Sequence, residues 1–262
     1  MSINESSKKL LRTIEEGLQN GEFKMYLQFI VDNKTKGIVS AEALSRWETE
    51  EGVVSPGKYI RAMEDSGLIT VLDYQMFENA CRKLSEWART ERDAISISCN
   101  FTRITISDAD FADKIREIAD KYSFERHKLI VEITEDSIES NFEVAKENIV
   151  ATKALGFTVA LDDVGNGYTP LRNLCDYPID VVKLDRALLL LTDTERGRKL
   201  FYGVISLMHS LDLTLVCEGV ETEEQNEFVS ASDCDLIQGW YYSTALPEVE
   251  AEAFARAYTH KI

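Results

Sequence analysis

The chain has 262 residues, of which 44% are hydrophobic and 29% are charged, and its formal net charge is -17. This length is ordinary for a single α/β barrel, and the composition is that of a soluble globular protein. No apolar run is long enough to span a bilayer, and so strong a negative charge is unlike the Lys/Arg patches that bind nucleic acids. We therefore expect neither a membrane nor a nucleic-acid polymer among its partners.

Residues 1–21 carry charges throughout, unlike a secretory signal, and predict an amphipathic helix that ends at Asn20-Gly21. Its apolar face comprises Leu10, Leu11, Ile14 and Leu18. The five cysteines form no closely spaced pair, which is typical of a reducing compartment. The sequence thus predicts a cytoplasmic protein.

Strands and helices are predicted to alternate along the middle of the chain. β-branched apolar runs at 94–100, 129–135, 158–163, 181–185 and 213–221 are interspersed with helical patterns near 107–121, 140–155, 169–175 and 222–231. This alternation favours parallel βα units closed into a barrel. Three helix starts are expected from capping patterns, at Ser55-Pro56, Ser140 with Glu143, and Thr222 with Gln225.

The first two predicted strands depart from this pattern. Segments 22–31 and 37–47 are joined by DNKTKG, which leaves no room for a crossover helix. We therefore expect these two strands to be antiparallel.

Polar residues stand at or near the ends of the predicted strands, and in a parallel barrel those ends converge on the face that carries the chemistry. They are Glu42, Asn100, Glu132, Asp162, Asp163, Lys183, Asp185, Glu218 and Gln238. Clustered carboxylates repel one another unless a cation lies among them, and hard oxygen ligands select Mg²⁺, Mn²⁺ or Ca²⁺. Two structural interpretations compete with a metal site: either Asp of the pair could cap a helix, and Glu132 could form a buried ion pair with Lys183.

Several motifs together resemble the EAL-domain phosphodiesterases over residues 22–247. They are Glu42-Ala43-Leu44 with Arg46-Trp47, SPGKYIRAMEDSGLI (55–69), Cys99-Asn100, EITE (132–135), DDVGNGY (162–168), KLD (183–185), EGVET (218–222) and QGWYYS (238–243). The resemblance implies a modified TIM-type (β/α)8 barrel with one antiparallel strand near the N-terminus. It also implies a single EAL domain over residues 1–262, with an N-terminal helix at 1–21, the motif-bearing barrel at 22–247 and a C-terminal helix at 248–262.

The same resemblance implies hydrolysis of cyclic di-GMP to linear pGpG with two Mg²⁺ or Mn²⁺ ions per active site, Ca²⁺ being inhibitory. The implied metal ligands are Glu42, Asn100, Glu132, Asp162, Asp163 and Glu218. The implied catalytic residues are Lys183, Glu218, Glu135 and Asp163. The implied substrate-binding residues are Gln28, Leu44, Arg46, Asp185, Glu221 and Gln238. A homodimer is implied as well.

One loop departs from the family pattern, because DDVGNGYTPL carries Val164, Asn166 and Pro170 where the family usually has DDFGTGYSSL. An alternative function is therefore a catalytically weak or inactive EAL domain that acts as a cyclic di-GMP receptor or a protein-binding regulator. A glycosidase with paired carboxylates is a further alternative. It does not explain Asn100, Lys183 and the EGVET segment together.

Overall fold

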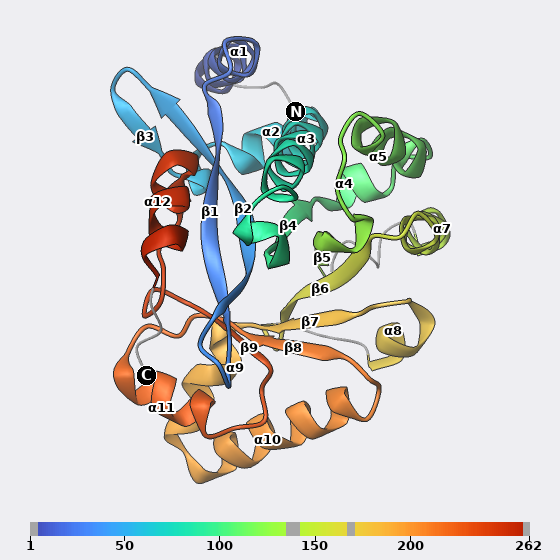
Figure 1. Ribbon diagram of the computed structural model, residues 1–262. Helices are drawn as coiled ribbons and strands as arrows, with labels where there is room; N and C mark the ends of the chain where they lie inside the picture. Colours follow the sequence, from blue (N-terminus) through green and yellow to red (C-terminus); the bar gives the residue numbers. More distant parts are fainter. Residues whose placement is uncertain (1–4, 135–141, 167–170, 259–262) are drawn as a thin grey trace.

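The computed structural model describes residues 5–134, 142–166 and 171–258 and contains a closed barrel of strands with helices around it (Figure 1). The barrel strands are β1 (Phe23–Asp32), β2 (Ile38–Thr49), β4 (Ser96–Phe101), β5 (Leu129–Thr134), β6 (Thr158–Val164), β7 (Val181–Leu184), β8 (Thr214–Cys217) and β9 (Leu236–Gln238). From β2 to β9 neighbouring barrel strands are parallel, whereas β1 is antiparallel to both β2 and β9 and closes the barrel between them. The predicted barrel with one antiparallel strand is confirmed.

Helices cover the outside of the barrel, as Figure 1 shows. They are α1 (Glu5–Gln19), α2 (Ile60–Ser66), α3 (Ile69–Trp87), α4 (Arg103–Ile106), α5 (Phe111–Ala119), α7 (Phe142–Ala154), α8 (Leu171–Asp176), α9 (Arg186–Leu190), α10 (Glu195–His209), α11 (Glu223–Ser230) and α12 (Glu248–Ala257). Two short strands, β3 (Gly52–Val54) and β10 (Leu246–Pro247), extend the sheet beside β2 and β1. None of the described helices is long and apolar enough to cross a membrane.

The capping predictions had mixed outcomes. Thr222 and Gln225 form a reciprocal capping box at the start of α11, as predicted. The predicted helix start at Ser55-Pro56 is confirmed, with Ser55 at the N-cap and Pro56 at the first helical position, but this helix is a short 3-10 turn, and α2 begins only at Ile60 after Tyr59 at φ -127°. Ser140 lies outside the described residues.

Strand register brings the polar residues into contact. On the antiparallel pair, Gln28 lies opposite Glu42, and on the parallel pair β4–β5, Asn100 lies beside Glu132. Since directly paired residues project to the same face of a sheet, these side chains share the barrel interior.

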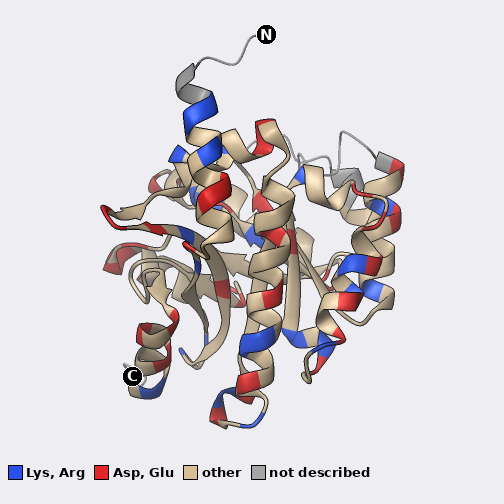
Figure 2. Ribbon diagram, turned by 90° about the horizontal axis from the view of Figure 1, so that it is seen from above, with Lys and Arg blue, Asp and Glu red and all other residues tan. Residues whose placement is uncertain are grey.

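In the view of Figure 2, basic and acidic residues are interspersed over the helices. The chain as a whole carries a formal net charge of -17. The expectation that the chain has no nucleic-acid polymer among its partners stays a prediction.

A buried carboxylate ties α3 to the segment that follows β4. Asp73 is 6% exposed, and one of its oxygens accepts hydrogen bonds from the Thr102 backbone N–H (3.0 Å), the Thr102 hydroxyl (2.8 Å) and the Thr105 hydroxyl (2.6 Å). Burial raises the pKa of Asp73 to about 6, even though these three hydrogen bonds act in the opposite direction. The folded state therefore holds a proton on Asp73 at pH values where the unfolded chain has released it.

We expect Asp73→Asn to change how stability depends on pH, because Asn keeps an acceptor oxygen and never ionises. In the native protein, Asp73 lowers the free energy of unfolding as the pH rises from about 4 to 6, by up to about 3 kcal/mol. The variant should therefore gain stability relative to the native protein over this interval. Urea unfolding of both proteins at pH 4 to 7 measures the difference, and a difference that does not vary with pH would contradict this account.

Candidate functional site

Lys183 lies at the centre of the barrel mouth and faces four carboxylates. Its Nζ is 2.8 Å from Glu218, 3.1 Å from Glu132, and 3.3 Å from both Glu42 and Asp162. The lysine side chain is 1% exposed, so the ammonium depends on these oxygens in place of water. One positive charge thus balances only part of a buried negative cluster.

Two amides fix the orientation of Glu42. Asn100 Nδ2 donates to one of its oxygens at 2.7 Å, and Gln238 Nε2 donates to the other at 2.6 Å. The Oε1 atom of Gln238 is buried and has no hydrogen-bond partner in the described part of the chain. It is therefore an acceptor that a ligand or a water molecule could use.

Burial and mutual repulsion perturb the acids of this cluster. Burial raises the pKa of Glu218 to about 8, with Asp162 and Glu42 adding to the shift and Lys183 opposing it. Burial likewise raises the pKa of Glu132 well above its ordinary value. For Glu42 burial acts in the same direction, but the charge of Lys183 and the hydrogen bonds from Gln238 and Asn100 hold its pKa below the usual value. The surrounding carboxylates outweigh burial at Lys183 and raise its pKa, so the lysine stays charged.

Asp163 stands apart from the other carboxylates in its backbone conformation. Its φ of +62° is uncommon for a residue with a side chain, and its backbone N–H donates to Asp162 Oδ1 at 2.9 Å. The Asp163 side chain is exposed at the rim, where one of its oxygens still lies within 4.8 Å of oxygens of Asp162 and Glu218. Strain of this kind is typical of functional sites.

The carboxylates form two groups that could hold metal ions. In each group, one oxygen from every member lies within 4.8 Å of the others, and Asp162 belongs to both. The first group contains Glu42, Glu132 and Asp162, and the second contains Asp162, Asp163 and Glu218. Carboxylate oxygens without thiolate or imidazole suit Mg²⁺ or Mn²⁺.

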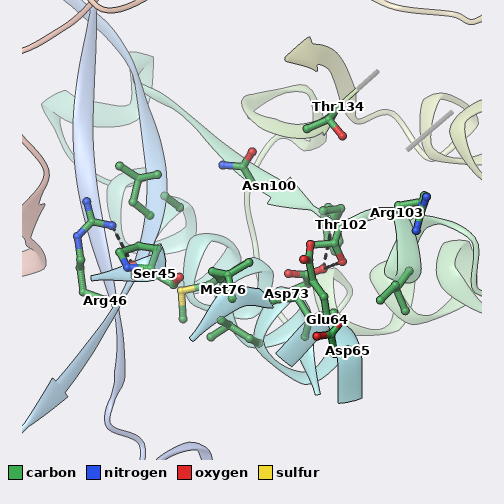
Figure 3. Close-up of a pocket in the computed structure, with 18 residues that line it drawn as sticks. Ser45, Arg46, Glu64, Asp65, Asp73, Met76, Asn100, Thr102, Arg103 and Thr134 are labelled. Carbon is green, nitrogen blue, oxygen red and sulfur yellow. Dashed lines mark hydrogen bonds between the residues drawn. The ribbon is translucent and has the colours of Figure 1, made fainter. Parts of the chain in front are cut away.

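A cavity of about 600 Å³ lies on one side of the mouth (Figure 3). Arg46 and Ser45 from β2 line one flank, and Asp73 with Arg103 line another. The Arg46 guanidinium donates to the Ser45 carbonyl at 2.9 Å and lies over the Tyr26 ring, 5.8 Å from its centroid. The remaining lining residues are Ala43, Leu44, Pro56, Ile60, Glu64, Asp65, Ile69, Leu72, Met76, Asn100, Phe101, Thr102, Ile104 and Thr134.

A second, smaller cavity of about 270 Å³ is lined in part by Glu42 and Glu218 of the acidic cluster. Its lining residues are Gln28, Glu42, Leu44, Asp185, Arg186, Glu218, Gly219, Glu221, Gln238, Gly239 and Trp240. Leu44 lines both cavities and so lies between them. Two of these lining residues, Arg186 and Glu221, form an ion pair with each other at 2.6 Å.

The EAL domain family model matches residues 11–245 of the chain. The chain belongs to the EAL domain family. The barrel, the acidic mouth and the motifs are therefore those of an EAL domain.

Curated relatives of this EAL domain include three signalling proteins. The cyclic di-GMP phosphodiesterase RocR of Pseudomonas aeruginosa is 30% identical over 90% of this chain and 60% of RocR. The cyclic di-GMP phosphodiesterase NbdA of the same organism is 28% identical, and the oxygen sensor protein DosP of Escherichia coli is 30% identical. These two matches cover 94% and 95% of this chain, but 32% of NbdA and 32% of DosP. The chain thus spans only part of the length of the curated relatives that it matches.

Solved structures resemble this EAL domain over nearly its whole length. A complex of the PaMucR phosphodiesterase with c-di-GMP superposes with a TM-score of 0.87, at 26% identity over 93% of this chain and 99% of that one. An EAL domain protein from Listeria monocytogenes superposes with a TM-score of 0.83, at 26% identity over 97% of this chain and 98% of that one.

The structure gathers most of the residues singled out from the sequence around this EAL mouth. Beyond the four carboxylates and Asn100, it brings Gln28, Asp185, Glu221 and Gln238 to the smaller cavity and Arg46 to the larger one. Besides the partners given above for Arg46, Glu221 and Gln238, Asp185 Oδ1 accepts from Ala187 N at the start of α9, and Gln28 Nε2 donates to the Ser243 carbonyl. Glu135 lies outside the described residues.

The smaller cavity also contains three residues that were not predicted as site residues from the sequence: Arg186, Gly219 and Trp240. Arg186 directly follows the KLD motif and Gly219 lies within EGVET. Their position beside or within these motifs is the sequence signal that could have identified them as site residues. Gly219 has φ +68°, and a Cβ there would lie 2.5 Å from the Arg186 Cβ. Glycine at this position therefore allows Arg186 to reach Glu221.

We expect Lys183→Met to destabilise the fold in EDTA at pH 8, because the buried carboxylates would lose the one ammonium that contacts them in the described part of the chain. The free energy of unfolding should fall by about 3–5 kcal/mol. Lys153→Met is the matched control: Lys153 pairs with Asp180 at 2.7 Å but is 31% exposed, so its loss should change stability by about 1 kcal/mol or less. Equal effects of the two substitutions in urea unfolding would contradict the central role of Lys183.

Proposed function

We propose that this chain hydrolyses one phosphodiester bond of cyclic di-GMP to give linear pGpG, with two divalent cations at the barrel mouth. The observation that carries the proposal is the set of carboxylates around Lys183 in a chain of the EAL domain family. Relatives named as cyclic di-GMP phosphodiesterases support the reaction class.

The residues present suit two Mg²⁺ or Mn²⁺ ions. Glu42, Asn100, Glu132 and Asp162 would hold the first ion, and Asp162, Asp163 and Glu218 would hold the second. The two oxygen-only groups that share Asp162 support this assignment. When bound, such ions lower the pKa of a water molecule and stabilise charge on the reacting phosphate.

Side chains of the chain itself would position the reactants. Lys183 remains charged and is held in one place by its carboxylate partners, so it can orient the attacking water by hydrogen bonding. Asn100 and Gln238 hold both oxygens of Glu42, which fixes the direction in which its lone pairs point. Glu135, which lies outside the described residues, remains a proposed catalytic residue.

The two cavities suit a ligand with two lobes and a charged centre. Arg46 and Arg103 line the larger cavity, Arg186 lines the smaller one, and each guanidinium can neutralise a phosphate. We assign Leu44, Gln28, Asp185, Glu221 and Gln238 to the walls that contact the rest of the substrate. In this proposal residues 1–262 act as a single cytoplasmic EAL domain and form a homodimer.

We expect Glu42→Gln to abolish metal-dependent hydrolysis, because the variant keeps the shape of the side chain but removes a charged ligand. The loss should be at least about 100-fold, since even second-shell changes at metal sites reduce activity by about 10–100-fold. Glu48→Gln on the same strand is the control, because Glu48 contacts Tyr26 and lies away from the mouth. Purified proteins are incubated with cyclic di-GMP and Mg²⁺ or Mn²⁺, with EDTA as the blank, and pGpG is followed by chromatography.

Full activity of Glu42→Gln, or equal losses in both variants, would refute the metal assignment. Tight binding of cyclic di-GMP by the native protein without pGpG would instead indicate a receptor. Absence of both binding and turnover would favour a protein-binding regulator.

We expect Asp163→Asn to reduce turnover severely while cyclic di-GMP still binds, because only the second metal group loses a charge. We also expect Ca²⁺ to support binding but not turnover, since its looser coordination fixes the reacting groups poorly. Calorimetric titration beside the chromatographic assay measures both. Rapid hydrolysis with Ca²⁺ alone would contradict this expectation.

A further inference from the structure

An aromatic cavity of about 440 Å³ lies outside the acidic mouth, between the turn after β9 and the end of α12. Its lining residues are Lys36, Asn226, Tyr241, Tyr242, Phe254, Ala257 and Tyr258. None of them belongs to the residues that line the two mouth cavities. This volume lies within the range of about 300–1,000 Å³ that small-molecule sites occupy.

Two aromatic pairs from different parts of the chain form the walls. Tyr241 and Tyr242 meet edge to face with ring centroids 5.1 Å apart, and Phe254 and Tyr258 have ring centroids 5.5 Å apart. Phe254 also stacks on Phe29 of β1 at 5.4 Å, which anchors that wall to the barrel. Rigid aromatic walls favour a flat ring that can stack or pack edge to face.

The polar groups at this cavity are mainly hydrogen-bond donors. Lys36 Nζ donates to Asn33 Oδ1 and to Ser230 Oγ, both at 2.7 Å, so two of its three protons are used within the described residues. Asn33 is itself buried and donates to the carbonyls of Val229, Ser232 and Cys234, which holds the Lys36 turn in place. The third ammonium proton is therefore available from a fixed position to an acceptor in the cavity.

Asn226 adds a second donor. Its Oδ1 accepts from the Tyr242 hydroxyl, which directs the oxygen toward the protein and leaves the amide N–H₂ for a ligand. Burial lowers the pKa of Lys36, with Asp32 acting in the opposite direction. A desolvated ammonium gains most from an anionic partner.

We propose that this cavity is a second binding site, which takes a planar aromatic molecule carrying an anionic group such as a carboxylate. The ring lies between the Tyr241–Tyr242 and Phe254–Tyr258 pairs, and the anionic group meets Lys36 and Asn226. The same turn carries Trp240, which lines the smaller mouth cavity, so one short segment contributes side chains to both sites.

The test uses 2-naphthoate as the probe and 2-naphthamide as its uncharged isostere, with calorimetric titration of the full chain in EDTA. The native protein should bind 2-naphthoate at least about tenfold more tightly than 2-naphthamide, because only the anion forms a charge-assisted hydrogen bond. Lys36→Gln should remove that preference while 2-naphthamide affinity stays the same.

Ala257→Trp should abolish binding of both probes by filling the cavity. Ala253→Trp is the matched control on the same helix: Ala253 is exposed and does not line the cavity, so binding should persist. Circular dichroism establishes that each variant is folded. No binding to the native protein, equal affinity for the two probes, or equal effects of both tryptophan substitutions would overturn the proposal. The readout is independent of hydrolysis, so it fails or succeeds separately from the proposed phosphodiesterase function.

Discussion

The buried contact between Lys183 and its four carboxylates is the constraint on which the barrel mouth depends. Isolated charges are strongly unfavourable in a protein interior, yet one ammonium here faces Glu42, Glu132, Asp162 and Glu218 within 3.3 Å. The negative charge exceeds what one lysine can balance, and its repulsion adds to the burial that raises the pKa of Glu218 and Glu132. A buried site with an excess of negative charge is suited to bind divalent cations.

The antiparallel strand β1 gives this site its asymmetry. Because β1 pairs with both β2 and β9, it brings Gln28 opposite Glu42 and lies beside Gln238 at Ile30. On the other side of the mouth, the parallel strands present their carboxyl ends in register. Glu42 on β2 thus receives Asn100 from the neighbouring strand β4 on one oxygen, and Gln238 from β9 together with Lys183 on the other, so both of its oxygens are bound.

Much of this arrangement could be predicted from the sequence, because strand periodicity and motif order determine which residues reach the carboxyl ends of the strands. The short connection DNKTKG was enough to predict the antiparallel pair, and Glu132 within an apolar run required a partner that proved to include Lys183. Other features depend on tertiary packing. The Arg186–Glu221 bridge over Gly219 joins two segments that are distant in the sequence, which local patterns do not encode. The positive φ of Asp163 and the 3-10 turn at Pro56 are local conformations that the residue patterns did not predict.

The most direct measurement is anomalous diffraction from crystals of this chain grown with Mn²⁺ and cyclic di-GMP. The account predicts two manganese peaks about 3.5–4 Å apart, as in other two-metal phosphodiester sites. One should lie among Glu42, Glu132 and Asp162, and the other among Asp162, Asp163 and Glu218. A mouth without manganese, with Lys183 still holding all four carboxylates beside bound cyclic di-GMP, would contradict it.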